Sequence, residues 1–126
     1  MATHAQVSAS TALGDTVKTL VDTITTPQGA KSIIGIWGYS EGGPGLTTLE
    51  NRSGIMEFES SDAPIVPLQL PLDVVVVLTS GVSAFSPRVW PVNIPLGGQC
   101  RISCYMTMDM ALTVANKGRF GFVYDY

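Results

Sequence analysis

A strict two-residue alternation runs through residues 99–110, which read Q-C-R-I-S-C-Y-M-T-M-D-M. One parity is apolar and consists of Cys100, Ile102, Cys104, Met106, Met108 and Met110. Successive side chains of a β-strand point to opposite faces of its sheet, so the segment is predicted to be a strand with one buried and one exposed face. A helix is incompatible with this pattern, because Arg101, Tyr105 and Asp109 would interrupt its apolar stripe.

Strand and turn signals recur along the rest of the chain. Apolar or alternating segments predict strands at residues 31–39, 46–50, 55–60, 74–79, 86–95 and 119–126. Turn residues are predicted to separate them at 27–29, 40–45, 51–54, 80–81, 96–98 and 116–118. This layout predicts an all-β fold, an antiparallel β-sandwich that is jelly-roll-like, with about seven to nine strands.

Residues 13–26 allow two interpretations. A helical stripe is formed by Leu13, Val17, Leu20, Val21 and Ile24. A strand is favoured by the β-branched residues Thr16, Thr19, Thr23, Thr25 and Thr26. We favour the strand because strands are predicted in the segments that follow, and the helix stays open as the alternative.

The length of 126 residues is enough for one domain with one core. Residues 1–12 are small and polar without any period, so they are predicted to be a flexible N-terminal arm. Residues 13–126 are predicted to form a single β-sandwich domain. Within it, Pro64, Pro67 and Pro71 exclude a central strand, and residues 62–72 are predicted to be an extended connection.

The composition indicates a protein that assembles. Charged residues make up 13% of the chain and hydrophobic residues 45%, whereas about 25% charged residues is typical. So few charges leave part of the surface to be covered by other subunits, which predicts a homo-oligomer. The net charge of −3 and the scattered basic residues argue against direct binding of nucleic acid. No apolar run is long enough for a transmembrane segment, and the first residues do not predict a secretion signal.

Residues 38–42 read G-Y-S-E-G and match the G-x-S-x-G pattern of a nucleophile elbow at Ser40. An elbow is followed by a helix, and its triad continues with an acid and then a histidine. Here G-P-G follows, and the single histidine, His4, lies upstream in the predicted arm. We therefore predict a glycine-rich loop at Ser40 and no enzymatic activity.

No cofactor or metal site is predicted. The chain has one histidine and two cysteines, and Cys100 and Cys104 lie on one strand face at a separation of about 13 Å, too far for a disulfide. They are predicted to be free buried thiols, which suit a reducing site of synthesis. The carboxylates of Glu57, Glu59 and Asp62 could hold calcium, but a solvated strand face is the better interpretation. Residues 51–53 (N-R-S) match a glycosylation site, yet they are predicted to be a turn.

Two sets of aromatic residues are candidates for an interaction surface. Trp37, Tyr39, Trp90 and Tyr105 fit either a sugar-stacking platform or subunit contacts. The last segment alternates, with Phe120, Phe122, Tyr124 and Tyr126 on one face. We favour contacts between subunits, and the candidate contact residues are Trp37, Tyr39, Trp90, Phe120, Phe122, Tyr124 and Tyr126.

The layout of the chain resembles that of single jelly-roll coat or decoration proteins of viruses. The similarity lies in the short polar arm, the threonine-rich strand, the Pro-Gly turn before I-I-G-I-W, the proline-rich middle and the closing aromatic strand. It implies a self-assembling structural subunit of a viral particle, with copies of itself and other virion proteins as partners. Assembly in the host cytoplasm and a place in the virion are the expected localisation. The alternative is a carbohydrate- or receptor-binding β-sandwich module, such as a spike or adhesin.

Overall fold

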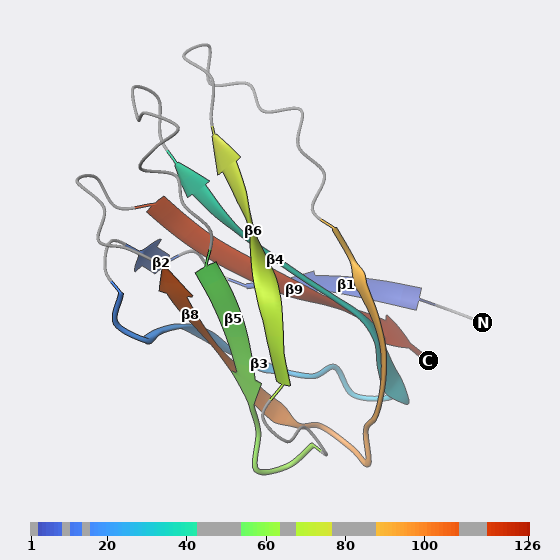
Figure 1. The fold of residues 1–126 in the computed structure, drawn as a ribbon. Coiled ribbons are helices and arrows are strands. Elements are labelled where there is room, and N and C mark those ends of the chain that lie inside the picture. Colours follow the sequence, from blue (N-terminus) through green and yellow to red (C-terminus); the bar gives the residue numbers. More distant parts are fainter. Residues whose placement is uncertain are drawn as a thin grey trace.

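The computed structural model describes residues 3–8, 11–13, 16–42, 54–63, 68–76, 88–108 and 116–126. These ranges contain β-strands and no helix, as Figure 1 shows. The strands are β1 (Thr3–Val7), β2 (Thr11–Leu13), β3 (Thr19–Thr25), β4 (Ser32–Gly42), β5 (Gly54–Glu59), β6 (Leu68–Val76), β7 (Trp90–Pro95), β8 (Arg101–Met108) and β9 (Asn116–Asp125). The predicted all-β class is confirmed.

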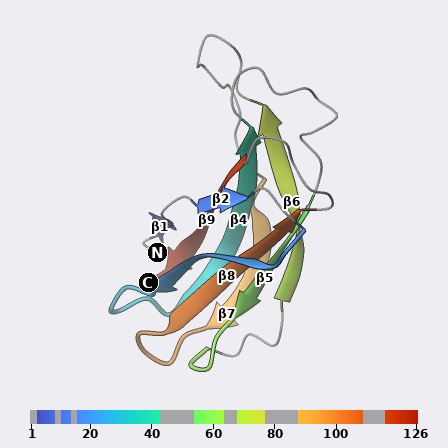
Figure 2. The same ribbon diagram turned by 90° about the vertical axis from the view of Figure 1, so that its left-hand side faces the viewer.

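The strands form two sheets that pack face to face around one core (Figure 2). In the first, sheet A, β9 and β4 lie side by side, β1 and β2 pair with the outer edge of β9, and β7 and β6 pair with the other edge of β4. In the second, sheet B, the order is β3-β8-β5-β6. The result is a β-sandwich, as the sequence predicts, and the jelly-roll strand order stays a prediction.

Strand β6 belongs to both sheets. Its first half pairs with β5, from Leu68 opposite Phe58 to Leu72 opposite Gly54. From Asp73 onward it pairs instead with β4, and this ladder is parallel. The other strand pairs in the described ranges are antiparallel, so the predicted antiparallel arrangement holds outside the β4–β6 pair.

The alternating segment at residues 99–110 contains β8, and its predicted faces are correct. Ile102, Cys104, Met106 and Met108 are buried, while the residues between them are partly or fully exposed. Residues 109 and 110 lie outside the described ranges. Strand β3 likewise settles the second half of residues 13–26 as a strand rather than a helix.

The centre of the core is aromatic. Phe58 of β5 contacts Phe120 and Phe122 of β9 with ring centroids 5.8 and 5.7 Å apart. Phe122 also packs edge-to-face against Tyr124, at 6.2 Å. Such tilted and edge-on arrangements are preferred because of the quadrupoles of the rings. Three of these four rings belong to β9, so β9 contributes most of the aromatic contacts between the two sheets.

The arm predicted over residues 1–12 is paired rather than free in its described part. Thr3–Val7 and Thr11–Leu13 lie along the same edge of β9. Between them, the backbone N–H of Ser8 donates to the Phe120 carbonyl at 2.9 Å, and the Ser8 hydroxyl accepts from the Phe120 N–H at 3.0 Å. Backbone groups of an otherwise open strand edge supply this pairing, so no hydrophobic alternation is needed in the arm itself.

Several strand boundaries differ from those predicted, including the start of β5 at Gly54 and of β7 at Trp90. Strand β6 begins at Leu68 and includes Pro71, because this part of β6 pairs only with β5 and an edge tolerates a missing N–H donor. Strand β4 continues through the predicted loop as far as Gly42, and residues 43–45 lie outside the described ranges. The turn predicted at 116–118 is the start of β9, where β2 and β4 pair on either side. The predicted strand at 46–50 and the turns at 51–53 and 80–81 also lie outside the described ranges.

Candidate interaction surface

Three of the candidate contact residues fill the chain's own core. Phe120, Phe122 and Tyr124 have no exposed surface. A side chain with no exposed surface cannot touch a second subunit, so these three are not contacts in this structure. Alternation identifies the two faces of a strand, but it does not say which face the chain itself covers.

Trp37 and Tyr39 lie on the opposite, outer face of sheet A. Both are partly exposed, and their rings are nearly parallel, with centroids 6.0 Å apart and planes inclined by 11°. Trp37 is directly opposite Gly121 of β9. The Trp37 ring occupies the space where a side chain at position 121 would project, so the tryptophan packs against the bare backbone of β9.

Valines extend this apolar surface to both sides of the aromatic pair. Val7 of β1 is also opposite Gly121 and is 54% exposed. Val89, just before β7, is 49% exposed, and its Cγ1 together with Val123 surrounds the space above Gly35. We call the surface formed by Val7, Gly35, Trp37, Tyr39, Val89, Gly121 and Val123 the outer A face.

Charges on the outer A face lie at the two ends of β9. Arg119 is exposed and is opposite Tyr39 in the register, near the start of the strand. Asp125 is opposite Ser32 at the end of the strand. The Oδ1 atom of Asp125 is buried and has no hydrogen-bond partner. Within the described part of the chain, the ion pairs do not include either residue.

The two remaining candidates lie at the border of the core. Trp90 of β7 packs partly against the core, with the Arg88 guanidinium 4.2 Å from its ring centroid and its Nε1 buried without a hydrogen-bond partner. Tyr126 also packs partly against the core, and its ring lies beside the turn residue Gly29. Both side chains keep some exposed surface, so contact with another molecule remains open to them.

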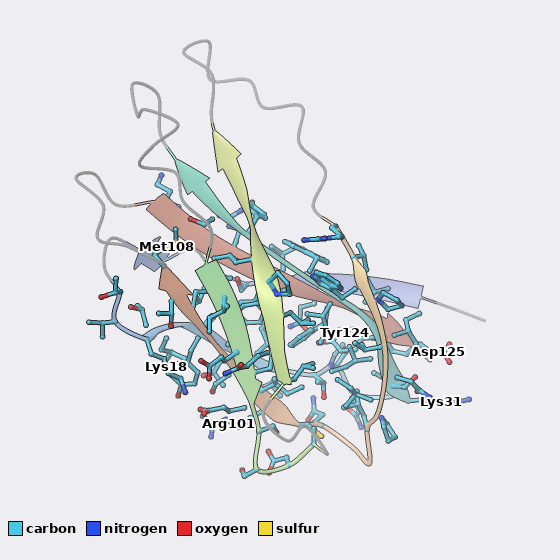
Figure 3. All side chains as sticks on the ribbon, viewed as in Figure 1. Lys18, Lys31, Arg101, Met108, Tyr124 and Asp125 are labelled. Carbon is cyan, nitrogen blue, oxygen red and sulfur yellow. The ribbon has the colours of Figure 1, made fainter. Side chains whose placement is uncertain are left out.

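The outer face of sheet B carries a cluster of charged side chains beside the exposed Leu20 and Ile55. Lys18, which is labelled in Figure 3, forms ion pairs with Glu59 at 3.1 Å and with Glu57 at 3.3 Å. Its Nζ lies 4.7 Å from the centroid of the Tyr105 ring. Hydrogen bonding to Glu59 raises the pKa of Lys18. Glu57 and Glu59, two of the carboxylates considered for calcium, are thus paired with a lysine of the same chain. The third, Asp62, accepts a hydrogen bond from the backbone N–H of Arg101 at 3.2 Å.

Ser40 lies inside β4 rather than on a turn. It is fully buried and is opposite Gly118 of β9 on one side and Val74 of β6 on the other. His4 is opposite Tyr124. Tyr124 lies six residues after Gly118, the β9 residue opposite Ser40, which corresponds to about 20 Å along the strand. Residues whose backbones are this far apart cannot act together as nucleophile and base.

Both thiols are free and buried, as predicted. Burial raises the pKa of Cys104, and burial followed by the charge of Asp62 raises the pKa of Cys100. The Cys100 N–H donates to the Thr26 hydroxyl at 2.8 Å, which ties the start of β8 to the end of β3. Among the described residues, no three His, Cys, Asp or Glu side chains are grouped as a metal site would require.

Comparisons with protein families, with curated proteins and with solved structures found no match to this chain. The described ranges contain no helix with the length and apolarity needed to cross a lipid bilayer. The sequence did not reveal Val7, Val89, Arg119, Gly121 or Asp125 as parts of a surface. A glycine within the aromatic terminal strand was the one available signal, because it marks a close approach of another group.

Proposed function

We propose that this protein is a self-assembling structural subunit without catalytic activity, and that the assembly is a viral particle. The observation that carries the proposal is the outer A face, where partly exposed aromatic rings lie between exposed valines. Clusters of Trp and Tyr surrounded by apolar neighbours are typical of interface centres. The low content of charged residues supports the same conclusion, because exposed apolar surface is then covered by neighbouring subunits.

The viral context rests on the layout resemblance, and it includes a capsid or decoration role, partners among other virion proteins and assembly in the host cytoplasm. The buried free thiols support synthesis in a reducing compartment. The burial of Ser40 argues against a hydrolase that uses it as nucleophile, because a substrate cannot reach this side chain in this structure.

The assembly proposal is tested by multi-angle light scattering of the purified chain over a wide range of concentrations. We expect a mass that rises with concentration above the 13.4 kDa of one chain. A mass of one chain at every concentration up to the solubility limit would contradict self-assembly. Electron microscopy of the concentrated sample then tests the viral context. Closed shells or regular arrays are expected, and amorphous aggregate alone would count against it.

A second candidate function is favoured by one specific observation. The nearly parallel rings of Trp37 and Tyr39 are suited to stacking against the apolar face of a sugar ring, so a carbohydrate-binding module is the alternative. Titration with mono- and oligosaccharides, followed by tryptophan fluorescence, tests it. Saturable quenching that disappears in Tyr39→Ala would support glycan binding, and no response to a broad sugar panel would reject it.

A further inference from the structure

We infer that the outer A face pairs with the outer A face of a second copy, with the two β9 strands running antiparallel across a two-fold axis. This inference rests on the proposed self-assembly and identifies the surface that it uses. Face-to-face packing of sheets is a common way to bury an apolar sheet surface. A two-fold interface uses the same patch on both subunits, so the patch must be complementary to itself.

The charges of β9 meet this requirement. Its outer positions read Arg119, Gly121, Val123 and Asp125, which places a cation at one end, an anion at the other and apolar residues between them. When a second β9 runs antiparallel across it, Arg119 of each copy faces the partner's Asp125, and Gly121 faces the partner's Val123. Lys117 is not needed for this match, because the antiparallel register pairs the four positions from Arg119 to Asp125 with one another.

The state of Asp125 in the single chain supports an external partner. Its Oδ1 is buried and without a hydrogen-bond donor, although buried carboxylate oxygens are generally satisfied. Its neighbours in the register are Thr3 and Ser32, neither of which carries a charge. A guanidinium from a second copy would place an opposite charge beside this partly exposed side chain, and the carboxylate would have to turn for Oδ1, which its own chain covers, to accept from it.

The size of sheet A approaches that of one side of a standard protein interface. In its described part sheet A is four strands wide, about 19 Å at the usual strand spacing, and β9 is about 33 Å long. The flat footprint is about 600 Å², and the accessible area is larger because side chains corrugate it. Stable interfaces bury about 800 Å² per partner. Trp37 and Tyr39 of the outer A face are residue types that are enriched at the centres of specific contacts.

Charge reversal tests the inference. The single variants Arg119→Asp and Asp125→Arg each place like charges opposite each other at both symmetric contacts. Each should raise the dimer dissociation constant by about tenfold or more at low ionic strength, measured by sedimentation equilibrium. An equal mixture of the two variants restores opposite charges at both contacts, so the mixture should recover the mass of the wild-type dimer. The double variant R119D/D125R should also dimerise with itself.

The outcomes separate this inference from the proposed function. If wild type self-associates and both single variants behave like wild type, the outer A face is not the interface, but self-assembly stands. If wild type is monomeric at all concentrations, both proposals fail. Circular dichroism checks folding of each variant. As a second test that does not involve Asp125, Val7→Glu should abolish dimerisation. Leu20→Glu, at a 47% exposed position on the outer face of sheet B, should leave dimerisation intact.

Discussion

Trp37 of β4 covers Gly121 of β9, and the absence of a side chain at position 121 is what allows the indole ring to lie there. The same glycine is opposite Val7 of β1, so three strands meet at this point of the outer A face. An aromatic ring across from a glycine restores the cross-strand packing that the glycine lacks. The pair therefore connects the N-terminal strand, the central strands and the exposed aromatic surface.

Gly121→Ala should destabilise the fold by about 1–3 kcal/mol, the usual cost of an extra methyl group in a filled space. Its Cβ would overlap the Trp37 ring and lie 2.6 Å from the backbone oxygen of Gln6, so both β4 and β1 must shift. The measurement is the free energy of unfolding in urea. Gly97→Ala is the matched control, because nothing lies within 4 Å of that Cβ, and it should be neutral or slightly stabilising. Equal changes in the free energy of unfolding for Gly121→Ala and Gly97→Ala would show that contact with Trp37 does not restrict the side chain at position 121.

Tyr124→Phe should loosen β1. The Tyr124 hydroxyl donates to Gln6 Oε1 at 2.6 Å, and burial raises the pKa of Tyr124, so the hydroxyl remains a donor at neutral pH. Losing this partly buried bond should cost about 1–2 kcal/mol. Hydrogen exchange should show faster exchange at residues 3–8 than in wild type, with β8 unchanged. Uniform acceleration over the whole chain would mean that the bond supports the core in general rather than the N-terminal strand.

Stability should decline at alkaline pH. Burial raises the pKa of Cys104 above its ordinary value of 9.0 and that of Tyr124 above its ordinary value of 10.0. Above pH 9.0 the unfolded chain therefore loses protons that the folded chain retains, and the folded state loses relative stability as pH rises toward the folded pKa values. Urea unfolding between about pH 7 and pH 11 measures the decline. In Cys104→Ala the decline should be shallower than in wild type, because only Cys100 and Tyr124 then contribute, and an unchanged profile would contradict this assignment.

Lys18→Met should cause a small loss of stability that depends on salt. Lys18 is exposed and is paired with both Glu57 and Glu59, and screening by salt weakens such surface pairs. The variant should differ from wild type at low ionic strength and converge with it at high ionic strength, as followed by thermal unfolding. Lys31→Met is the control, because Lys31 is exposed and has no part in the described ion pairs. A difference that persists in high salt would assign the effect to packing on Tyr105.

The sequence predicts best where a strand has one buried and one exposed face. In β8, every described position from Cys100 to Met108 has the burial that its parity predicts. In β9, Phe120, Phe122 and Tyr124 do share one face, but alternation alone could not show that this face is the core rather than a contact surface. Which side of a strand the chain itself covers depends on the position of the other sheet, and that is set by long-range pairing.

Some strands could not be predicted from the sequence, because backbone hydrogen bonds to neighbouring strands, rather than a pattern of side chains, produce them. Strands β1 and β2 lack any hydrophobic period, and they form because β9 offers an open edge. The turn residues at 116–118 are held in a strand by neighbours on both sides. The outer A face was likewise predicted only through Trp37 and Tyr39, because Val7, Gly121 and Asp125 become neighbours through strand register, which is a property of the tertiary fold.

The passage of β6 from one layer to the other has a mechanical consequence. Leu72 ends the ladder with β5, and Asp73 begins the ladder with β4 without any intervening loop. Sliding of the layers past each other along this side would have to break backbone hydrogen bonds in one of these two ladders. Force applied to one sheet is therefore transmitted to the other through the backbone of β6, so the domain resists deformation most strongly on this side.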